Sequence, residues 1–240
     1  MQTDNHPPQE DTSRYVLGHK LSNLLTPVVG MAHILSTKAA DCGNKDAERL
    51  ARTIHDAAQV ASRLLSLFIR TRDIETGTQE PSKRPGDLSL LLGSVLHDLE
   101  ATIEDVGAKV DLTTDGSCRI MMDCELLPAA FRYLIEGTLH DLAAEPELSQ
   151  RLITIQVERA GNEALVVTRY NAGSIGPHRL ERFFDPTGAP ANAETGRTGL
   201  EYSYARAVVE AHGGRASVAS PEPGVVLVTV VLPADEERGS

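Results

Sequence analysis

A histidine on the polar side of a predicted helix is the side chain of this chain best placed to do chemistry. His19 opens the run His-Lys-Leu-Ser-Asn-Leu-Leu-Thr-Pro, which ends at Pro27. Apolar residues recur through this segment in alternating steps of four and three, the spacing of a coiled-coil seam: Leu17, Leu21, Leu24, Val28, Met31 and Leu35. His19 falls opposite this seam, and Asn23 and Thr26 share its face. An imidazole that faces water in this way can act as a nucleophile.

The helix that carries His19 is predicted to pair with a second helix. The first should run over about residues 14–37, and the residues Asp-Cys-Gly-Asn at 41–44 are typical of a turn. The second should run over about 46–72, because the four-three rhythm returns at Leu50, Ile54, Ala57, Ala61, Leu64 and Phe68. Two long helices joined by a short turn lie antiparallel. A lone hairpin leaves its seams half covered, so we expect a homodimer through residues 13–75 that forms a four-helix bundle. Pro27 lacks the N–H that would bond to the carbonyl of Asn23, so a kink is expected there.

The remainder of the chain mixes helices and strands. Helices are predicted over 88–106, 125–144 and 200–211. Strands are predicted over 109–114, 119–122, 152–159, 164–170, 216–219 and 225–232, of which the third and fourth form a β-hairpin. This order predicts an α+β fold class, in which an antiparallel helical hairpin is followed by an α/β sandwich with helices on one face of a mixed sheet.

Composition divides the chain into five segments. Residues 1–12 are polar and contain prolines, which predicts a disordered lead-in. Residues 13–75 form the predicted hairpin domain, and 76–86, with two prolines, a linker. Residues 87–234 form the sandwich domain, and 235–240 are a polar tail.

Charge and composition exclude several classes of partner. The formal net charge is -11, and residues 1–80 are nearly balanced with 10 acids and 9 bases, so the excess of acids lies in the C-terminal part. This charge argues against nucleic acid and against an anionic membrane surface as partners. No apolar run is long enough to span a bilayer and no basic-then-apolar stretch is seen at the N-terminus, so we expect neither a membrane span nor a secretory leader. Three cysteines without metal-ligand spacing fit reduced thiols, so we expect a cytoplasmic protein that holds no metal.

Together these pieces resemble the core of a sensor histidine kinase, a dimerising helical hairpin followed by a Bergerat-type ATPase domain. The resemblance covers residues 15–233. Residues 19–27 are similar to the family's phosphoacceptor box, and 180–186, with Phe-Phe-Asp-Pro, resemble its phenylalanine box. Gly199-Leu200, Val208-Val209 and His212-Gly213-Gly214 follow the order of its C-terminal half. The resemblance implies that His19 is a phosphoacceptor.

The departures from the family fall where ATP would be handled. The substituted positions are Gly137, Tyr170, Ala172, Ser174, Arg197 and Glu201. Gly137 stands where the family has an asparagine that helps to hold magnesium, and glycine has no side chain to ligate a metal. Tyr170 replaces the aspartate that reads adenine. Glu201 replaces a glycine of the phosphate-covering loop and brings negative charge toward a triphosphate. These substitutions predict that the chain binds no nucleotide cofactor and hydrolyses no ATP.

The residue after the histidine also departs from the family. An acid that acts as a base during autophosphorylation is usual there, whereas this chain has Lys20, which cannot accept a proton while charged. A lysine could instead attract a phosphorylated partner or neutralise phosphohistidine. Asn23 matches the position that orients a hydrolytic water, which leaves phosphatase activity open. Lys20, Asn23 and Thr26 are thus the expected supporting residues around His19.

We therefore predict a histidine kinase-like histidine phosphotransferase of a two-component phosphorelay. His19 would accept a phosphoryl group from the aspartate of one response-regulator receiver domain and pass it to another, with Mg²⁺ supplied by the receiver. Two alternatives stay open. One is a non-catalytic pseudokinase scaffold that binds a response regulator or a kinase, and the other is a divergent ATP-dependent histidine kinase. His33, two heptads after His19, is a rival acceptor.

Overall fold

A computed structural model describes residues 9–145, 147–172, 175–188, 191–192 and 195–235, with their side chains from residue 24 onward. These residues fall into two compact units. The first contains the chain up to residue 70 together with 190–198, and the second contains 71–189 together with the chain from residue 199.

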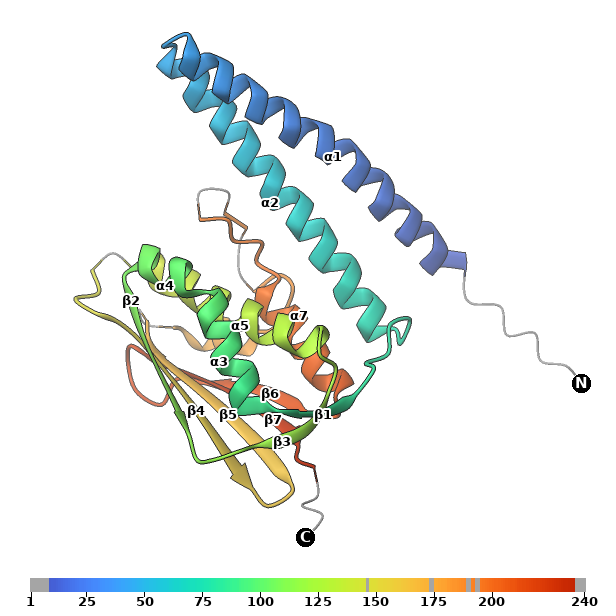
Figure 1. The fold of residues 1–240 in the computed structure, drawn as a ribbon, viewed down its shortest axis with the longest axis vertical. Coiled ribbons are helices and arrows are strands. Elements are labelled where there is room, and N and C mark those ends of the chain that lie inside the picture. Colours follow the sequence, from blue (N-terminus) through green and yellow to red (C-terminus); the bar gives the residue numbers. More distant parts are fainter. Residues whose placement is uncertain (1–8, 146, 173–174, 189–190, 193–194, 236–240) are drawn as a thin grey trace, which may run out of the picture. The chain divides into compact units, whose positions relative to one another are not determined.

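Two long helices make up most of the first unit. α1 (Gln9–Asp41) and α2 (Lys45–Glu75) form the predicted antiparallel hairpin (Figure 1). Gly43 adopts φ +68° at the end of α1, so that the N–H of Asn44 reaches the carbonyl of Ala39 at 2.9 Å. The side-chain oxygen of Asn44 then accepts the N–H of Ala47 at 3.1 Å and caps α2. The turn residues therefore end one helix and begin the next, as their types predict.

The first helix is longer than its apolar pattern predicts. It begins at Gln9, inside the segment expected to be disordered. It continues through Pro27 as a single helix. Residues 1–8 and the tail 236–240 lie outside the described residues.

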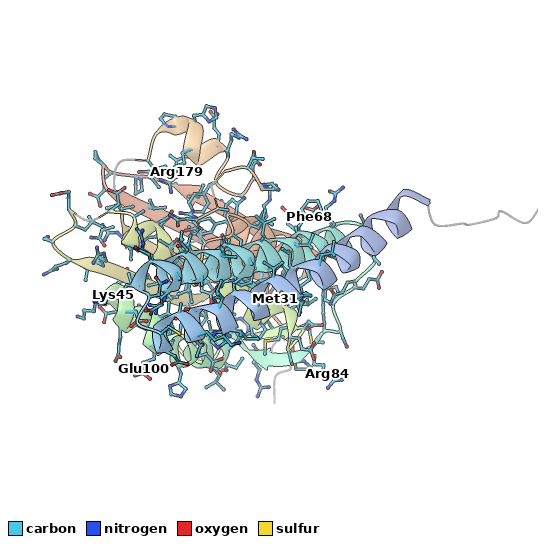
Figure 2. All side chains as sticks on the ribbon, turned by 90° about the horizontal axis from the view of Figure 1, so that it is seen from above. Met31, Lys45, Phe68, Arg84, Glu100 and Arg179 are labelled. Carbon is cyan, nitrogen blue, oxygen red and sulfur yellow. The ribbon has the colours of Figure 1, made fainter. Side chains whose placement is uncertain are left out.

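Many large apolar side chains of the hairpin face outward. Residues of the predicted seams are exposed on both helices: Leu24, Val28, Met31 and Leu35 of α1, and Leu50, Ile54 and Phe68 of α2. Figure 2 labels Met31 and Phe68 among them. Among the side chains that the structure describes, the buried apolar residues of the hairpin are four alanines and three larger residues of α2: Ala32, Ala39, Ala51 and Ala58, and Val60, Leu67 and Ile74. Small side chains allow close approach of two helices, and a single chain leaves many of its large apolar residues uncovered.

The second unit is built on a five-stranded sheet. Its strand order is β2 (Ala108–Thr114), β4 (Arg151–Ala160), β5 (Glu163–Asn171), β7 (Val225–Pro233) and β6 (Arg215–Ala219). The β2–β4 pair is parallel and the other pairs are antiparallel. Helices α3 (Leu88–Asp98), α5 (Leu126–Ala143) and α7 (Glu201–Ala211) lie over one face of the sheet (Figure 1). The predicted α+β class and mixed sheet are confirmed.

The core of this unit lies between the sheet and these helices. Alternate residues of the central strands are buried: Ile153, Ile155 and Val157 of β4, and Val226, Val228 and Val230 of β7. Their period of two matches the pleat of a strand with one face covered. No helix within the described ranges combines the length and apolarity needed to cross a bilayer.

Two local predictions need correction, and one short helix was missed. The segment 76–86 is not linker throughout, because β1 (Arg84–Asp87) pairs with β3 (Arg119–Met122). Gly86 looks like a turn residue, but a Cβ on it would collide with the side chain of Met122. The helix predicted over 88–106 is two helices, α3 and α4 (Glu100–Val106), separated at the buried Leu99 with φ -97° and ψ 2°. A short helix, α6 (Pro177–Glu181), was not predicted.

Candidate functional site

The predicted phosphoacceptor face lies on α1. The backbone is helical throughout residues 9–41, so His19, Asn23 and Thr26 fall on one face at spacings of four and three. The side chains of His19, Lys20 and Asn23 lie outside the described residues. Thr26 is exposed. The roles of these four residues therefore stay predictions.

Thr26 lies at a hollow between the two helices of the hairpin. The hollow has a volume of about 500 Å³ and is lined by Thr26, Val29, Gln59, Ser62 and Arg63. The guanidinium of Arg63 donates to the carbonyl of Gly196 at 2.7 Å. A loop residue of the same unit therefore lies against α2 near this hollow.

In the second unit, Gly137 of α5, which is expected at the family's magnesium position, contacts an aromatic ring. A Cβ built on Gly137 would lie 2.9 Å from ring carbons of Tyr202, closer than real side chains approach. Gly137 and Tyr202 are both buried. The ring of Tyr202 thus occupies the space that any side chain at residue 137 would need.

The hydroxyl of Tyr202 belongs to a buried polar cluster around Asp141. The Asp141 carboxylate is 3 % exposed and accepts three hydrogen bonds from three different elements. Tyr202 of α7 donates at 2.7 Å, Tyr170 of β5 at 3.0 Å and Arg179 of α6 at 2.7 Å. Burial and the nearby charge of Asp141 raise the pKa of each tyrosine well above its ordinary value, so both hydroxyls stay protonated and donate. A buried carboxylate held by three donors ties α5, α6, α7 and β5 together.

The phenylalanine-rich segment packs on the same tyrosine. The rings of Phe183 and Tyr202 lie 4.2 Å apart between centroids, and Phe183 contacts Phe184 edge to face at 5.1 Å. Phe184 lies 6.5 Å from Tyr202. All three side chains are buried. Aromatic rings therefore fill the space between α5, α7 and residues 183–184.

The other substituted positions divide between the two units. Ala172, Arg197 and Glu201 are buried, while Ser174 lies outside the described residues. Tyr170, which is expected at the family's aspartate position, donates its hydroxyl to Asp141. The sequence singled out Tyr170 and Gly137, but it did not single out Asp141 or Tyr202. The sequence signal for this cluster is the scarcity of aromatic residues. The chain has only nine Phe and Tyr residues, and four of them gather here.

A second buried polar cluster holds the beginning of α5. The Asp123 carboxylate accepts the N–H groups of Ser82, Glu125 and Leu126 at 2.7–2.9 Å. The backbone N–H of Asp123 donates to Nε2 of His212 at 3.0 Å. Nδ1 of the same ring lies 2.8 Å from the carbonyl of Val208 and donates to it. His212 is thus a structural histidine that must be neutral to accept at Nε2.

The free energy of unfolding should decrease as the pH is lowered from 7.5 to 5.5, because of His212. Burial lowers the pKa of His212 below its ordinary 6.5, so near and below pH 6.5 the unfolded chain binds a proton that the folded chain does not. The stability that comes from keeping His212 neutral is fully present above the pKa of His212 in the unfolded chain. It is lost as the pH falls toward the pKa of His212 in the folded chain, at up to about 1.4 kcal/mol per pH unit. Urea unfolding of the chain and of His212→Gln at both pH values measures this contribution as the difference between the two pH dependences. Equal pH dependences would contradict the assignment.

The comparisons with known proteins agree with this architecture. The histidine kinase-, DNA gyrase B- and HSP90-like ATPase family matches residues 125–236. The sensor protein CutS of Streptomyces coelicolor is 26% identical over 225 residues, which cover 90% of this chain and 52% of CutS. The sensor histidine kinase AruS of Pseudomonas aeruginosa is 27% identical over 213 residues, 85% of this chain and 20% of AruS. The chain therefore spans about half of CutS and about a fifth of AruS.

Solved structures show the same fold at low sequence identity. Full-length ShkA in complex with AMPPNP superposes with a TM-score of 0.72 at 14% identity, over 95% of this chain and 47% of ShkA. The Acinetobacter baumannii histidine kinase AdeS gives a TM-score of 0.62 at 12% identity, over 88% of this chain and 98% of AdeS. The chain thus has a histidine kinase-like fold, in which a helical hairpin precedes the part that matches the ATPase family, and its sequence is similar to those of the sensor proteins CutS and AruS.

Proposed function

We propose that this chain is a histidine phosphotransferase of a two-component phosphorelay. It accepts a phosphoryl group on His19 from a response-regulator receiver domain and passes it to a second receiver. The likeness to two-component sensor kinases supports receiver domains as the partners. The helical backbone of α1 supports the predicted face on which Asn23 and Thr26 accompany His19.

The observation that carries the proposal is the packing of Tyr202 on Gly137. The family would hold magnesium and nucleotide near this position, but Gly137 offers no ligand and the ring of Tyr202 excludes a larger side chain. Tyr170 stands in place of the adenine-reading aspartate and donates to Asp141 instead. The residues present do not fit ATP or its magnesium, so we derive no step through them.

The proposed reaction needs only the imidazole of His19 from this chain. A neutral ring nitrogen attacks the phosphorus of a receiver aspartyl phosphate, the P–O bond to the aspartate breaks, and the carboxylate leaves with the electron pair. The N–P bond of phosphohistidine replaces it. The second receiver reverses these steps with its own aspartate. Magnesium belongs to the receiver, where it neutralises charge on the transferring group.

The exposed apolar residues of the hairpin support a homodimer. Leu24, Met31 and Ile34 of α1 are 67 %, 70 % and 56 % exposed in a single chain. Burying such residues against a second hairpin contributes about 1.5–3 kcal/mol for each large side chain that becomes fully covered. A dimer through these faces gives the proposed four-helix bundle, with His19 on its outer surface.

Labelling by a phosphorylated receiver and by radiolabelled ATP tests the proposal directly. The receiver should produce an acid-labile label on the chain, whereas Mg²⁺ with ATP should produce none and should leave the melting temperature unchanged. A nucleotide present at one hundred times its Kd would stabilise the fold by about 2.7 kcal/mol. Labelling and stabilisation by ATP would establish an ATP-dependent kinase. Receiver binding without any label would establish a pseudokinase scaffold.

A further inference from the structure

Two histidines face each other across the hairpin, close to the end at which the helices are joined. His33 lies on α1 and His55 on α2, with their ring centroids 5.7 Å apart and their planes at 44°. Both line a hollow of about 490 Å³, whose other lining residues are Ser36, Thr37, Ala40, Glu48, Arg52 and Asp56. All these residues lie within the first unit. The proposed phosphotransfer does not use this pair.

Neighbouring side chains determine which nitrogen of His55 can bind a ligand. Oδ1 of Asp56 lies 3.3 Å from Nδ1 of His55. An ionised carboxylate can only accept, so Nδ1 carries the proton and Nε2 keeps its lone pair. Nε2 lies 3.3 Å from the side-chain nitrogen of Gln59, which donates to it. A histidine that donates one N–H to a carboxylate and presents its other nitrogen has the arrangement of a metal ligand.

The separation of the two rings suits a shared metal ion. Zinc–nitrogen bonds of about 2.0–2.1 Å with a tetrahedral angle place two bound imidazole centres about 5 Å apart. The observed 5.7 Å separation reaches this value by small side-chain rotations of the exposed His33 and the half-buried His55, with displacement of Gln59. Imidazole nitrogen is a preferred ligand of Zn²⁺, Ni²⁺ and Cu²⁺.

The charges around the hollow favour a cation over an anion. Glu48 and Asp56 are negative, and Arg52 pairs with Glu48 at 2.7 Å. With both imidazoles neutral, one negative charge remains in excess. A phosphate group would meet the Asp56 carboxylate, whereas a divalent cation is attracted by it.

We propose that His33 and His55 form a two-histidine site for a divalent transition metal that links α1 to α2. Within the ranges that the structure describes, no group of three His, Cys, Asp or Glu side chains could hold a metal ion. Water therefore completes the coordination. Asp56 acts as a positioning residue through Nδ1 of His55.

Nickel titration of the untagged full-length chain tests this site. Isothermal titration calorimetry with NiCl₂ at pH 7.5 should give a binding step that becomes about tenfold weaker or is lost in His33→Asn and in His55→Asn. Asp56→Asn should weaken it less than either histidine variant. His97→Asn is the matched control, because His97 also lies 3.6 Å from a carboxylate, that of Glu100, but no ring of another described residue lies against it. Its nickel affinity should equal that of the unmodified chain.

A thermal readout and two further ligands complete the test. NiCl₂ or ZnCl₂ should raise the melting temperature of the unmodified chain more than that of the two histidine variants, while MgCl₂ should leave all of them unchanged. Circular dichroism checks that the variants keep their helices. Equal nickel affinity of the unmodified chain and both histidine variants would overturn the proposal. Binding of inorganic phosphate that requires His33 and His55, without binding of nickel, would overturn it as well.

Discussion

Replacing His19 by glutamine should abolish phosphoryl transfer from a phosphorylated receiver domain to this chain. Glutamine keeps a similar size and forms helices well, so α1 should persist. Its amide nitrogen is not a nucleophile, and the reaction that we propose requires a ring nitrogen at this position. We expect the initial transfer rate to fall by at least about a thousandfold, the scale on which the loss of a single nucleophile acts. The measurement is the time course of acid-labile radiolabel on the chain after mixing with labelled receiver.

Two further variants make the result specific to His19. Lys20→Ala should retain a label, because the lysine is proposed only to attract phosphate, and the rate should depend less on salt concentration. His33→Gln separates the two candidate acceptors, since His33 lies two heptads further along α1. A label that is lost in His33→Gln but kept in His19→Gln would refute the assignment of His19.

Replacing Asp141 by alanine should destabilise the second unit strongly. The variant leaves the buried hydroxyls of Tyr170 and Tyr202 and the guanidinium of Arg179 without their common acceptor. Removing one partner of a buried ionic and hydrogen-bonded cluster costs about 3 kcal/mol. For a domain of this size the loss corresponds to a fall of roughly 6–12 °C in melting temperature. Differential scanning calorimetry of the full chain measures this shift.

A surface carboxylate provides the matched comparison for Asp141. Asp111 lies on β2 with its side chain 57% exposed and 3.7 Å from Lys109. Asp111→Ala should change the free energy of unfolding by less than about 0.5 kcal/mol. Asp141→Asn should fall between the two alanine variants, since an amide oxygen still accepts from the tyrosines. Equal melting temperatures for Asp141→Ala and Asp111→Ala would show that the buried cluster contributes little to stability.

Elements with a strong local signal could be predicted closely. β3 matches its predicted range of 119–122, and β4, β5, β6 and β7 differ from theirs by one residue at each changed end. These strands alternate apolar residues or lie between clear turn residues. β1 gave no such signal, because Pro85 and Gly86 are residues of turns and the strand exists only through pairing with β3. The break at Leu99 also arises from packing, since the apolar pattern runs on through 88–106.

The sequence predicted which residues of the family's nucleotide site are replaced in this chain, but not the contacts that the replacements make. Gly137 and Tyr170 stand out as substitutions because the resemblance supplies an expectation at each position. Nothing in the sequence relates Gly137 to Tyr202, which lies 65 positions further along the chain. The fold brings α5 and α7 together. The missing side chain at Gly137 of α5 then leaves the space that the ring of Tyr202 of α7 occupies. The same holds for Asp141, whose donors come from β5, α6 and α7.

The position of β7 has a consequence for biosynthesis. This strand follows the other strands of its sheet in sequence, yet it lies between β5 and β6 and pairs with both. While the ribosome is still translating residues before Val225, the growing polypeptide exposes the unpaired edge of β5, a surface prone to aggregation. The sheet can therefore be completed only after β7 has left the ribosome, whereas the helical hairpin, whose two helices are neighbours in sequence, can form as soon as both have emerged.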